Sequence, residues 1–117
     1  MNVKDYVIQA TINAIHSHTP SYRIWIDGEL MCERTFWPDP RLYLIRETMH
    51  VLLDYTTHAY RFELTNPTHG IAWTHDITII DEKSNQKLLY HKMKSLVDNN
   101  YQELKFTINS EEIINEI

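Results

Sequence analysis

Residues 58–81 read HAYRFELTNPTHGIAWTHDITIID, and this stretch carries the clearest β-structure signal in the chain. Residues 60–65 alternate strictly between apolar and polar side chains, which is the pattern of a half-buried strand. Asn66 and Pro67 end that strand, because proline has no N–H group to donate to a neighbouring strand. A second strand is predicted to begin at Ile77. The sequence therefore predicts two strands that support one exposed loop rich in histidine and aromatic residues.

Further strands are predicted on both sides of this stretch by the same alternation. Asp27 and Gly28 lie between two apolar runs and predict a tight hairpin, because such a turn needs positive φ angles. Polar turns are expected at residues 54–57 and 81–85, and residues 42–45 form a short apolar run. The other predicted strands are 22–26, 30–36, 49–53, 88–93 and 104–108.

Two segments near the ends of the chain allow two interpretations each. Residues 6–15 alternate as a strand would, but their isoleucines also match helical spacing and Asp5 could cap a helix. Their β-branched content favours the strand. Residues 110–117 could form one or two helical turns or an arm that docks on a neighbour, because so short a helix is marginal in water.

The number and spacing of the predicted strands indicate the fold class. Seven to eight short strands separated by regular turn signals predict an all-β chain that folds as a β-sandwich or jelly roll. The sequence contains no internal repeat, linker or low-complexity tract. Residues 1–117 are therefore predicted to form a single domain.

Composition and charge exclude several classes of partner. The formal net charge is -5 and the basic residues are scattered, whereas a nucleic-acid binder needs a basic stripe. No apolar run approaches the roughly 18 residues that cross a bilayer, and the N-terminus lacks a signal-peptide pattern. The single cysteine, Cys32, excludes an intrachain disulfide. We expect no nucleic acid or membrane partner, and a location in a cytosol or in a particle released by lysis.

Seven histidines raise the question of a metal site. His16 and His18 have a spacing that places both side chains on one face of a strand, and His69, His75 and Asp76 could add ligands if the loops meet. The alternative is a set of solvated loop histidines that make ordinary hydrogen bonds. Because the first pair lies in a predicted loop, we expect no metal and no cofactor.

The residue types needed for catalysis are not arranged in a recognisable motif. The chain has no G-x-S-x-G sequence, and Cys32 lies inside a predicted strand, where a cysteine is most often a small buried apolar residue. Glu111 and Glu112 are adjacent, and adjacent residues of a helix do not face each other. We therefore expect that the protein is not an enzyme.

Aromatic residues are the better candidates for binding. Trp25 alternates outward from an apolar strand face, while Trp37 and Trp73 are predicted in loops. Exposed indoles stack on sugar rings or anchor protein interfaces, although they could equally plug the open ends of a sandwich. The candidate residues for contact with a partner or glycan are Trp37, Tyr43, His69 and Trp73.

Three segments together resemble a known group of proteins. They are IDGELMCERTFW at residues 26–37, THAYRFELTNPTHG at 57–70 and HDITIIDE at 75–82. Their order, with a strand that ends in Asp-Gly, a second strand that ends in Asn-Pro and a return into a third strand, resembles β-sandwich structural proteins of tailed phages, marine ones especially. More distantly, it is similar to calcium-dependent carbohydrate-binding modules of the xylan-binding type.

The phage resemblance implies a non-enzymatic structural protein of a virion, such as a decoration or tail accessory component. Such a protein would be made in the host cytoplasm and would contact other virion proteins or copies of itself. The second resemblance implies a carbohydrate-binding module that uses loop tryptophans and binds a surface glycan. Asn66 and Asp76 correspond to calcium ligands of such modules, but residues 67–74 supply no carboxylate.

Overall fold

The computed structural model describes residues 3–15, 21–35, 44–66, 71–94, 100–109 and 112–115. These residues form nine strands and no helix, and therefore no helix that could span a bilayer. The strands are β1 (Val3–Ile15), β2 (Ser21–Ile26), β3 (Glu29–Thr35), β4 (Leu44–Asp54), β5 (Thr57–Leu64), β6 (Ile71–Asp81), β7 (Lys87–Lys92), β8 (Tyr101–Asn109) and β9 (Glu112–Asn115).

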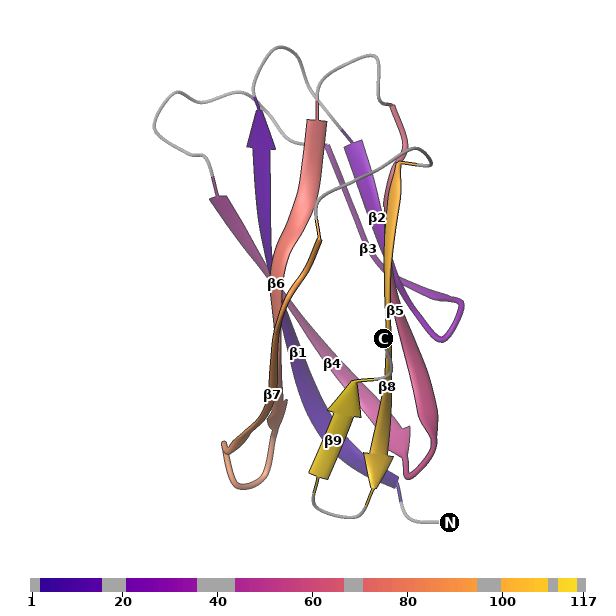
Figure 1. The fold of residues 1–117 in the computed structure, drawn as a ribbon, viewed down its shortest axis with the longest axis vertical. Helices are drawn as coiled ribbons and strands as arrows, with labels where there is room; N and C mark the ends of the chain where they lie inside the picture. The colour runs from indigo at the N-terminus through magenta and orange to yellow at the C-terminus, as the bar shows by residue number, and fades with distance from the viewer. Residues whose placement is uncertain are drawn as a thin grey trace.

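The strands form two antiparallel sheets that pack face to face. One sheet has the order β4-β1-β6-β7 and the other has the order β3-β2-β5-β8-β9 (Figure 1). This is the β-sandwich that the sequence predicts, with nine strands in the described residues where seven or eight were expected. Several strands that follow each other along the chain, such as β1 and β2 or β4 and β5, belong to different sheets, so the chain crosses between the layers several times.

Side chains that alternate inward from both sheets fill the space between them. Residues 6–15, which fit either a strand or a helix, belong to strand β1, which pairs with β4 on one side and β6 on the other. The side chains that are almost completely buried include Tyr6, Ile8, Ile12, Tyr22, Ile24, Tyr60, Phe62, Ile77, Ile79, Leu104 and Phe106. Their period of two along each strand confirms the alternation predicted for residues 22–26, 60–65 and 104–108.

The predicted tight hairpin joins β2 to β3. Asp27 has a φ angle of 52° and Gly28 a φ angle of 79°, and two successive positive values fit a type I′ turn. The twist of this turn matches the twist of the flanking strands. The polar turn predicted at residues 81–85 is also present, and Asn85 ends it with a φ angle of 59°.

Strand β6 begins six residues earlier than predicted. It starts at Ile71, so the expected loop before Ile77 is wrong for residues 71–76. The reason is a β-bulge: Thr74 pairs with Ile12 and Asp76 pairs with Thr11, so His75 has no partner on β1. A bulge inserts one residue and shifts the alternation, which hides the strand from a pattern with a period of two.

The C-terminal segment is neither a helix nor a free arm over its described residues. Glu112–Asn115 forms strand β9, which pairs with β8 at the edge of the five-stranded sheet. Ile113 lies opposite Ile108 and is buried. Pairing with an existing strand and burial of a β-branched side chain outweigh the helix-start signal.

Candidate functional site

The outer face of the sheet β4-β1-β6-β7 carries a small polar pocket. Its volume is about 170 Å³. One row across the sheet joins Arg46 on β4, Thr11 on β1 and Asp76 on β6. The pocket therefore presents two cations, one carboxylate and several neutral hydrogen-bonding groups, and its lining residues are Gln9, Thr11, Arg46, Asp76, Thr78, Lys87 and Tyr90.

Two aromatic side chains lie on the same outer face. Tyr90 is exposed, and its hydroxyl donates to Asp76 Oδ2 at 3.0 Å, a hydrogen bond that raises the pKa of the phenol. Trp73 lies opposite Asn13, one row beyond the Thr11–Asp76 pair, and its side chain is half-buried. The combination of an aromatic ring with convergent polar groups is typical of sites that bind small polar molecules.

The bulge at His75 is the reason that Trp73 and Asp76 share this face. In a regular strand, residues separated by three positions point to opposite faces. The extra residue at the bulge shifts the alternation by one position, so Trp73 and Asp76 point to the same face. The bulge is held by Gln102 on β8, whose amide accepts from Thr74 N at 2.7 Å and donates to Thr74 O at 2.9 Å.

Only part of the predicted binding set can be placed. Trp37, Tyr43 and His69 lie outside the described residues, whereas Trp73 lies in a strand and not in the predicted loop. Trp25 lies on β2, in the other sheet, so the described tryptophans do not converge.

The predicted metal ligands are divided in the same way. His16, His18 and His69 lie outside the described residues, whereas His75 and Asp76 belong to β6. Within the described ranges, no three side chains of His, Cys, Asp or Glu are grouped as metal ligands.

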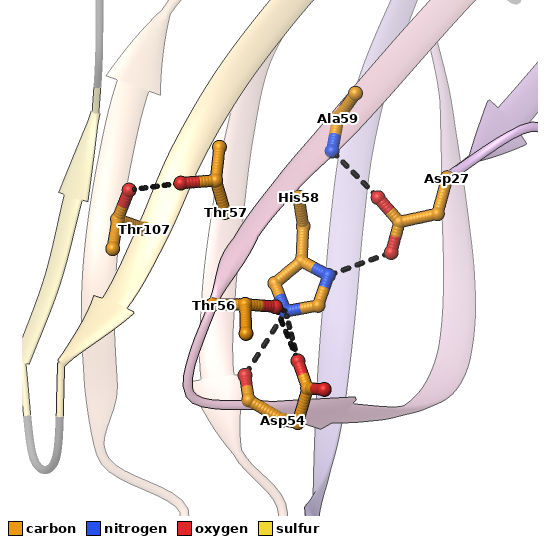
Figure 2. A network of polar contacts seen from close by, with 7 residues as sticks. All are labelled: Asp27, Asp54, Thr56, Thr57, His58, Ala59 and Thr107. Carbon is orange, nitrogen blue, oxygen red and sulfur yellow. Dashed lines mark hydrogen bonds and ion pairs between the residues drawn. The ribbon is translucent and has the colours of Figure 1, made fainter.

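A second polar cluster surrounds His58 at the start of β5. Its imidazole, with 7% of the side chain exposed, lies between two carboxylates (Figure 2). Nδ1 lies 2.6 Å from Asp27 Oδ2, and Nε2 lies 2.9 Å from the Asp54 backbone oxygen. Asp27 also accepts from the Ala59 N–H group at 2.8 Å. The cluster thus ties the β2–β3 turn to the β4–β5 turn.

The His58 cluster contains the residue types of a nucleophilic triad but lacks its hydrogen-bond pattern. Thr56 Oγ1 lies 3.3 Å from His58 Nε2, but this hydroxyl donates to Asp54 Oδ1. The Asp54 carbonyl oxygen lies closer to Nε2 than the hydroxyl does, and a carbonyl only accepts. The ring nitrogen that would take a proton from Thr56 is therefore engaged, and the cluster links two turns.

A third polar cluster joins the two sheets around Glu47 of β4. Its carboxylate, with 7% of the side chain exposed, accepts from Arg34 Nε at 2.7 Å, Arg34 Nη2 at 2.9 Å and Tyr22 OH at 2.7 Å. The Cys32 thiol lies 3.0 Å from Glu47 Oε2. Four donors therefore satisfy one buried carboxylate, which is the condition under which such a group can be buried.

These contacts shift the acid–base properties of the Glu47 cluster. Burial alone would raise the pKa of Glu47, but hydrogen bonds from Arg34, Cys32 and Tyr22 outweigh burial and lower it. Burial, followed by the hydrogen bond to Glu47, raises the pKa of Cys32 to about 12. A thiol with so high a pKa stays protonated near neutral pH and is a poor nucleophile.

The hydroxyl of Tyr6 is buried and has no hydrogen-bond partner among the described residues. Tyr6 also lines a cavity of about 340 Å³ together with Lys4 and Asp81, and these two residues form an ion pair at 3.0 Å.

Strand β4 forms one edge of its sheet. It pairs with β1 over eleven residues without a register shift, and its other side has no partner strand in the described part of the chain. Leu44 and Leu52, on its outer face, have 52% and 66% of their surface exposed. Exposed apolar side chains on an open edge mark a surface suited to contact with another protein.

Comparison of the chain with protein-family models, with curated proteins and with solved structures gave no match. The residues themselves therefore carry the functional argument. The sequence pattern identified Trp73 but not Tyr90, Arg46 or the β4 edge. Glu47 is separated from Met49 and from Leu53 by an even number of positions along β4, so all three side chains point to the same, inward face.

Proposed function

We propose that this protein is a non-enzymatic structural component of a virus particle, such as a decoration or tail accessory protein, that works through protein–protein contacts. The observation that supports this proposal best is the open edge of β4, with Leu44 and Leu52 exposed on its outer face. A long edge strand offers main-chain hydrogen bonds to a partner, and exposed apolar side chains add area to bury.

The other sheet edges are better protected against pairing. Strand β7 has six residues and lysines at both ends, and β9 has four residues. Strand β3 carries Glu29, Glu33 and Arg34, and its pairing with β2 contains a register shift. Short edges, charges and bulges all disfavour pairing with another chain. Strand β4 is the edge that combines length, regularity and apolar side chains.

The first prediction concerns the location of the protein. Purified particles of the virus that encodes the chain are expected to contain it in a fixed ratio to the main shell or tail protein. Quantitative mass spectrometry of gradient-purified particles measures this ratio. The ratio should stay constant through a high-salt wash, which removes proteins that adhere only by exposed charges. Absence of the chain from intact particles would contradict the proposed function.

A carbohydrate-binding function is the second candidate, and the pocket on the outer face of β4-β1-β6-β7 favours it. Tyr90 supplies aromatic surface, while Asp76, Gln9 and Arg46 supply hydrogen-bonding groups around a volume of about 170 Å³, and Trp73 lies outside this pocket on the same face of the sheet. Sugars are recognised by this combination of a ring face and planar polar side chains. The two functions are compatible, because an accessory protein of a virion can also bind a surface glycan.

The second prediction tests this pocket. Glycan-array binding followed by calorimetry should show that Asp76→Ala weakens binding at least about tenfold, because it removes a group that lines the pocket. Trp73→Ala should have the same effect if a bound sugar extends along the face to the indole. Trp25→Ala changes an indole on the opposite sheet and is the matched control, with affinity expected to stay unchanged. An array without any binding, or equal losses for Trp25→Ala and Trp73→Ala, would exclude this function for the pocket.

A further inference from the structure

We infer that the partner of the β4 edge is a second copy of the same chain, bound in one register that pairs Thr48 with Thr48 of the partner subunit. This inference deepens the proposed function by naming the partner. In this register the two β4 strands run antiparallel about a two-fold axis. The two four-stranded sheets then join into one continuous eight-stranded sheet across the axis.

In this register the two exposed leucines on the outer face of β4 lie opposite each other across the axis, and Arg46 lies opposite the partner's His50. The outward residues of β4 are Leu44, Arg46, Thr48, His50 and Leu52, because these pair with the outward residues of β1. With Thr48 on the axis, Leu44 lies opposite the partner's Leu52, and the same contact repeats on the other side of the axis. Both exposed leucines of each copy are thereby covered. Direct cross-strand apolar pairs are the contacts that stabilise a sheet.

The inward face fits the same register. Ile45 lies opposite the partner's Val51, and Glu47 lies opposite the partner's Met49. Ile45 and Val51 are only half-buried in the single chain, although both pack against its core. The register therefore extends the core across the axis. No carboxylate faces another carboxylate, and Glu47 keeps its own partner Arg34.

The neighbouring registers are less favourable. With Met49 on the axis, Leu44 faces the partner's Asp54 and Leu52 faces the partner's Arg46, so each leucine meets a charged residue. With His50 on the axis, two histidines face each other and Leu44 remains uncovered. That register would also pair Arg46 with the partner's Asp54, but the Asp54 carboxylate already lies 3.3 Å from His58 Nε2. A pairing register shifted by an odd number of residues would place inward-facing residues of one β4 strand opposite outward-facing residues of the other.

The third prediction tests the dimer in solution. Light scattering coupled to size exclusion should give twice the 14.0 kDa of one chain, with dissociation on dilution. Leu52→Glu places a carboxylate opposite the partner's Leu44 and should raise the dimer dissociation constant at least about tenfold. Leu44→Lys should do the same. The double variant L44K/L52E pairs lysine with glutamate across the axis and should recover much of the lost affinity.

Matched controls separate loss of the dimer from loss of the fold. Leu44 and Leu52 are exposed, so circular dichroism of each variant should match the wild type. Lys105→Glu changes a charge on the exposed face of β8, in the other sheet, and should leave the dimer intact. A wild-type chain that stays monomeric at every concentration, or a dimer that Leu52→Glu leaves unchanged, overturns the inference.

Cysteine cross-linking tests the register. In a Cys32→Ser background, Thr48→Cys should form an intersubunit disulfide, because directly opposed residues have Cα atoms about 4.5–5.5 Å apart. His50→Cys is the matched control. Its partner copy would lie four residues away along the strand, about 13 Å, which is beyond disulfide reach. Cross-linking of His50→Cys in place of Thr48→Cys overturns the register.

The outcomes distinguish this inference from the proposed function. A chain that is present in particles but monomeric in solution keeps the virion function and overturns the self-paired edge. A chain that dimerises through Thr48 but is absent from particles keeps the inference and overturns the virion function.

Discussion

Glu47→Ala is expected to destabilise the folded chain by about 3 kcal/mol, because it removes the one acceptor shared by four donors in a buried site. Tyr22 is fully buried and would keep a hydroxyl without a partner, whereas Arg34 is about half exposed and can regain water. The larger part of the loss should therefore come from Tyr22 and Cys32. Urea unfolding followed by tryptophan fluorescence measures the change in the free energy of unfolding.

A double-mutant cycle identifies the cause. Tyr22→Phe alone should cost about 1 kcal/mol, since it deletes one hydrogen bond and leaves the other donors satisfied. In the Glu47→Ala background the same change should be almost neutral or stabilising, because the hydroxyl it removes no longer has a partner. Additive losses, or a loss for Glu47→Ala of less than about 1 kcal/mol, would contradict the role assigned to this carboxylate.

The same carboxylate makes stability depend on pH on the acid side. The pKa of Glu47 is lowered in the folded state from its ordinary value of 4.5, so the unfolded chain binds the extra proton more readily. Its contribution is fully present well above pH 4.5 and is lost as the pH falls through the folded-state pKa. Glu47→Gln cannot titrate, so its stability should fall less steeply below pH 5 than that of the wild type. If the free energy of unfolding fell equally steeply with decreasing pH in the wild type and in Glu47→Gln, the assigned role of Glu47 in acid stability would be contradicted.

The fold was predictable where one face of a strand is buried without interruption. Apolar and polar residues alternate cleanly at residues 60–65 and 104–108, because one face of each strand packs on the core while the other face points outward. Asp27-Gly28 was predictable for another reason: few residues adopt two successive positive φ angles. In both cases the information is local, so the sequence pattern contains it.

The position of Trp73 on the same face as Asp76 was not predictable, because it depends on a bulge. Trp73 and Asp76 would point to opposite faces of a regular strand, and they share a face only because His75 is inserted between paired residues. The insertion is stabilised by Gln102, which binds Thr74 from 28 residues away along the chain. A contact over such a separation leaves no local pattern.

The Glu47 cluster could be predicted from the sequence only in part. Glu47 lies with Arg46 and Thr48 between the apolar run at residues 42–45 and the strand predicted from Met49, so neither prediction included it. If the alternation that buries Met49 and Leu53 is continued toward the N-terminus, Glu47 also points inward. Its partners Arg34 and Tyr22 come from two other strands in the opposite sheet, and only the three-dimensional packing brings them to it.

His58→Phe is expected to destabilise the chain by about 2–3 kcal/mol, although it replaces one buried ring by another. The His58 ring lies 5.7 Å from the Phe106 ring, so phenylalanine can keep that contact. It cannot form the contacts that the two ring nitrogens make with Asp27 and with the Asp54 carbonyl (Figure 2). The two aspartates have 42% and 27% of their side chains exposed and can take up water, which keeps the loss below that of a fully buried ion pair.

Two further variants separate the hydrogen bonds from the turn itself. Asp27→Asn keeps a residue that tolerates a positive φ and an oxygen that can accept from Ala59, so it should cost about 1 kcal/mol. Thr57→Val removes an exposed hydroxyl pair with Thr107 in the next strand and should change stability by about 0.5 kcal/mol or less.

Combining Asp27→Asn with His58→Phe tests whether the cluster acts as a unit. Once phenylalanine has replaced His58, the Asp27 carboxylate has no imidazole to contact. Asp27→Asn should then cost much less stability than it does in the wild-type background. Hydrogen exchange gives an independent measure, because the Ala59 amide should lose protection when the turn that Asp27 occupies loosens. If the two changes add fully and the Ala59 amide stays protected, then His58 stabilises the chain through its packing on Phe106, and the link between the two turns contributes little.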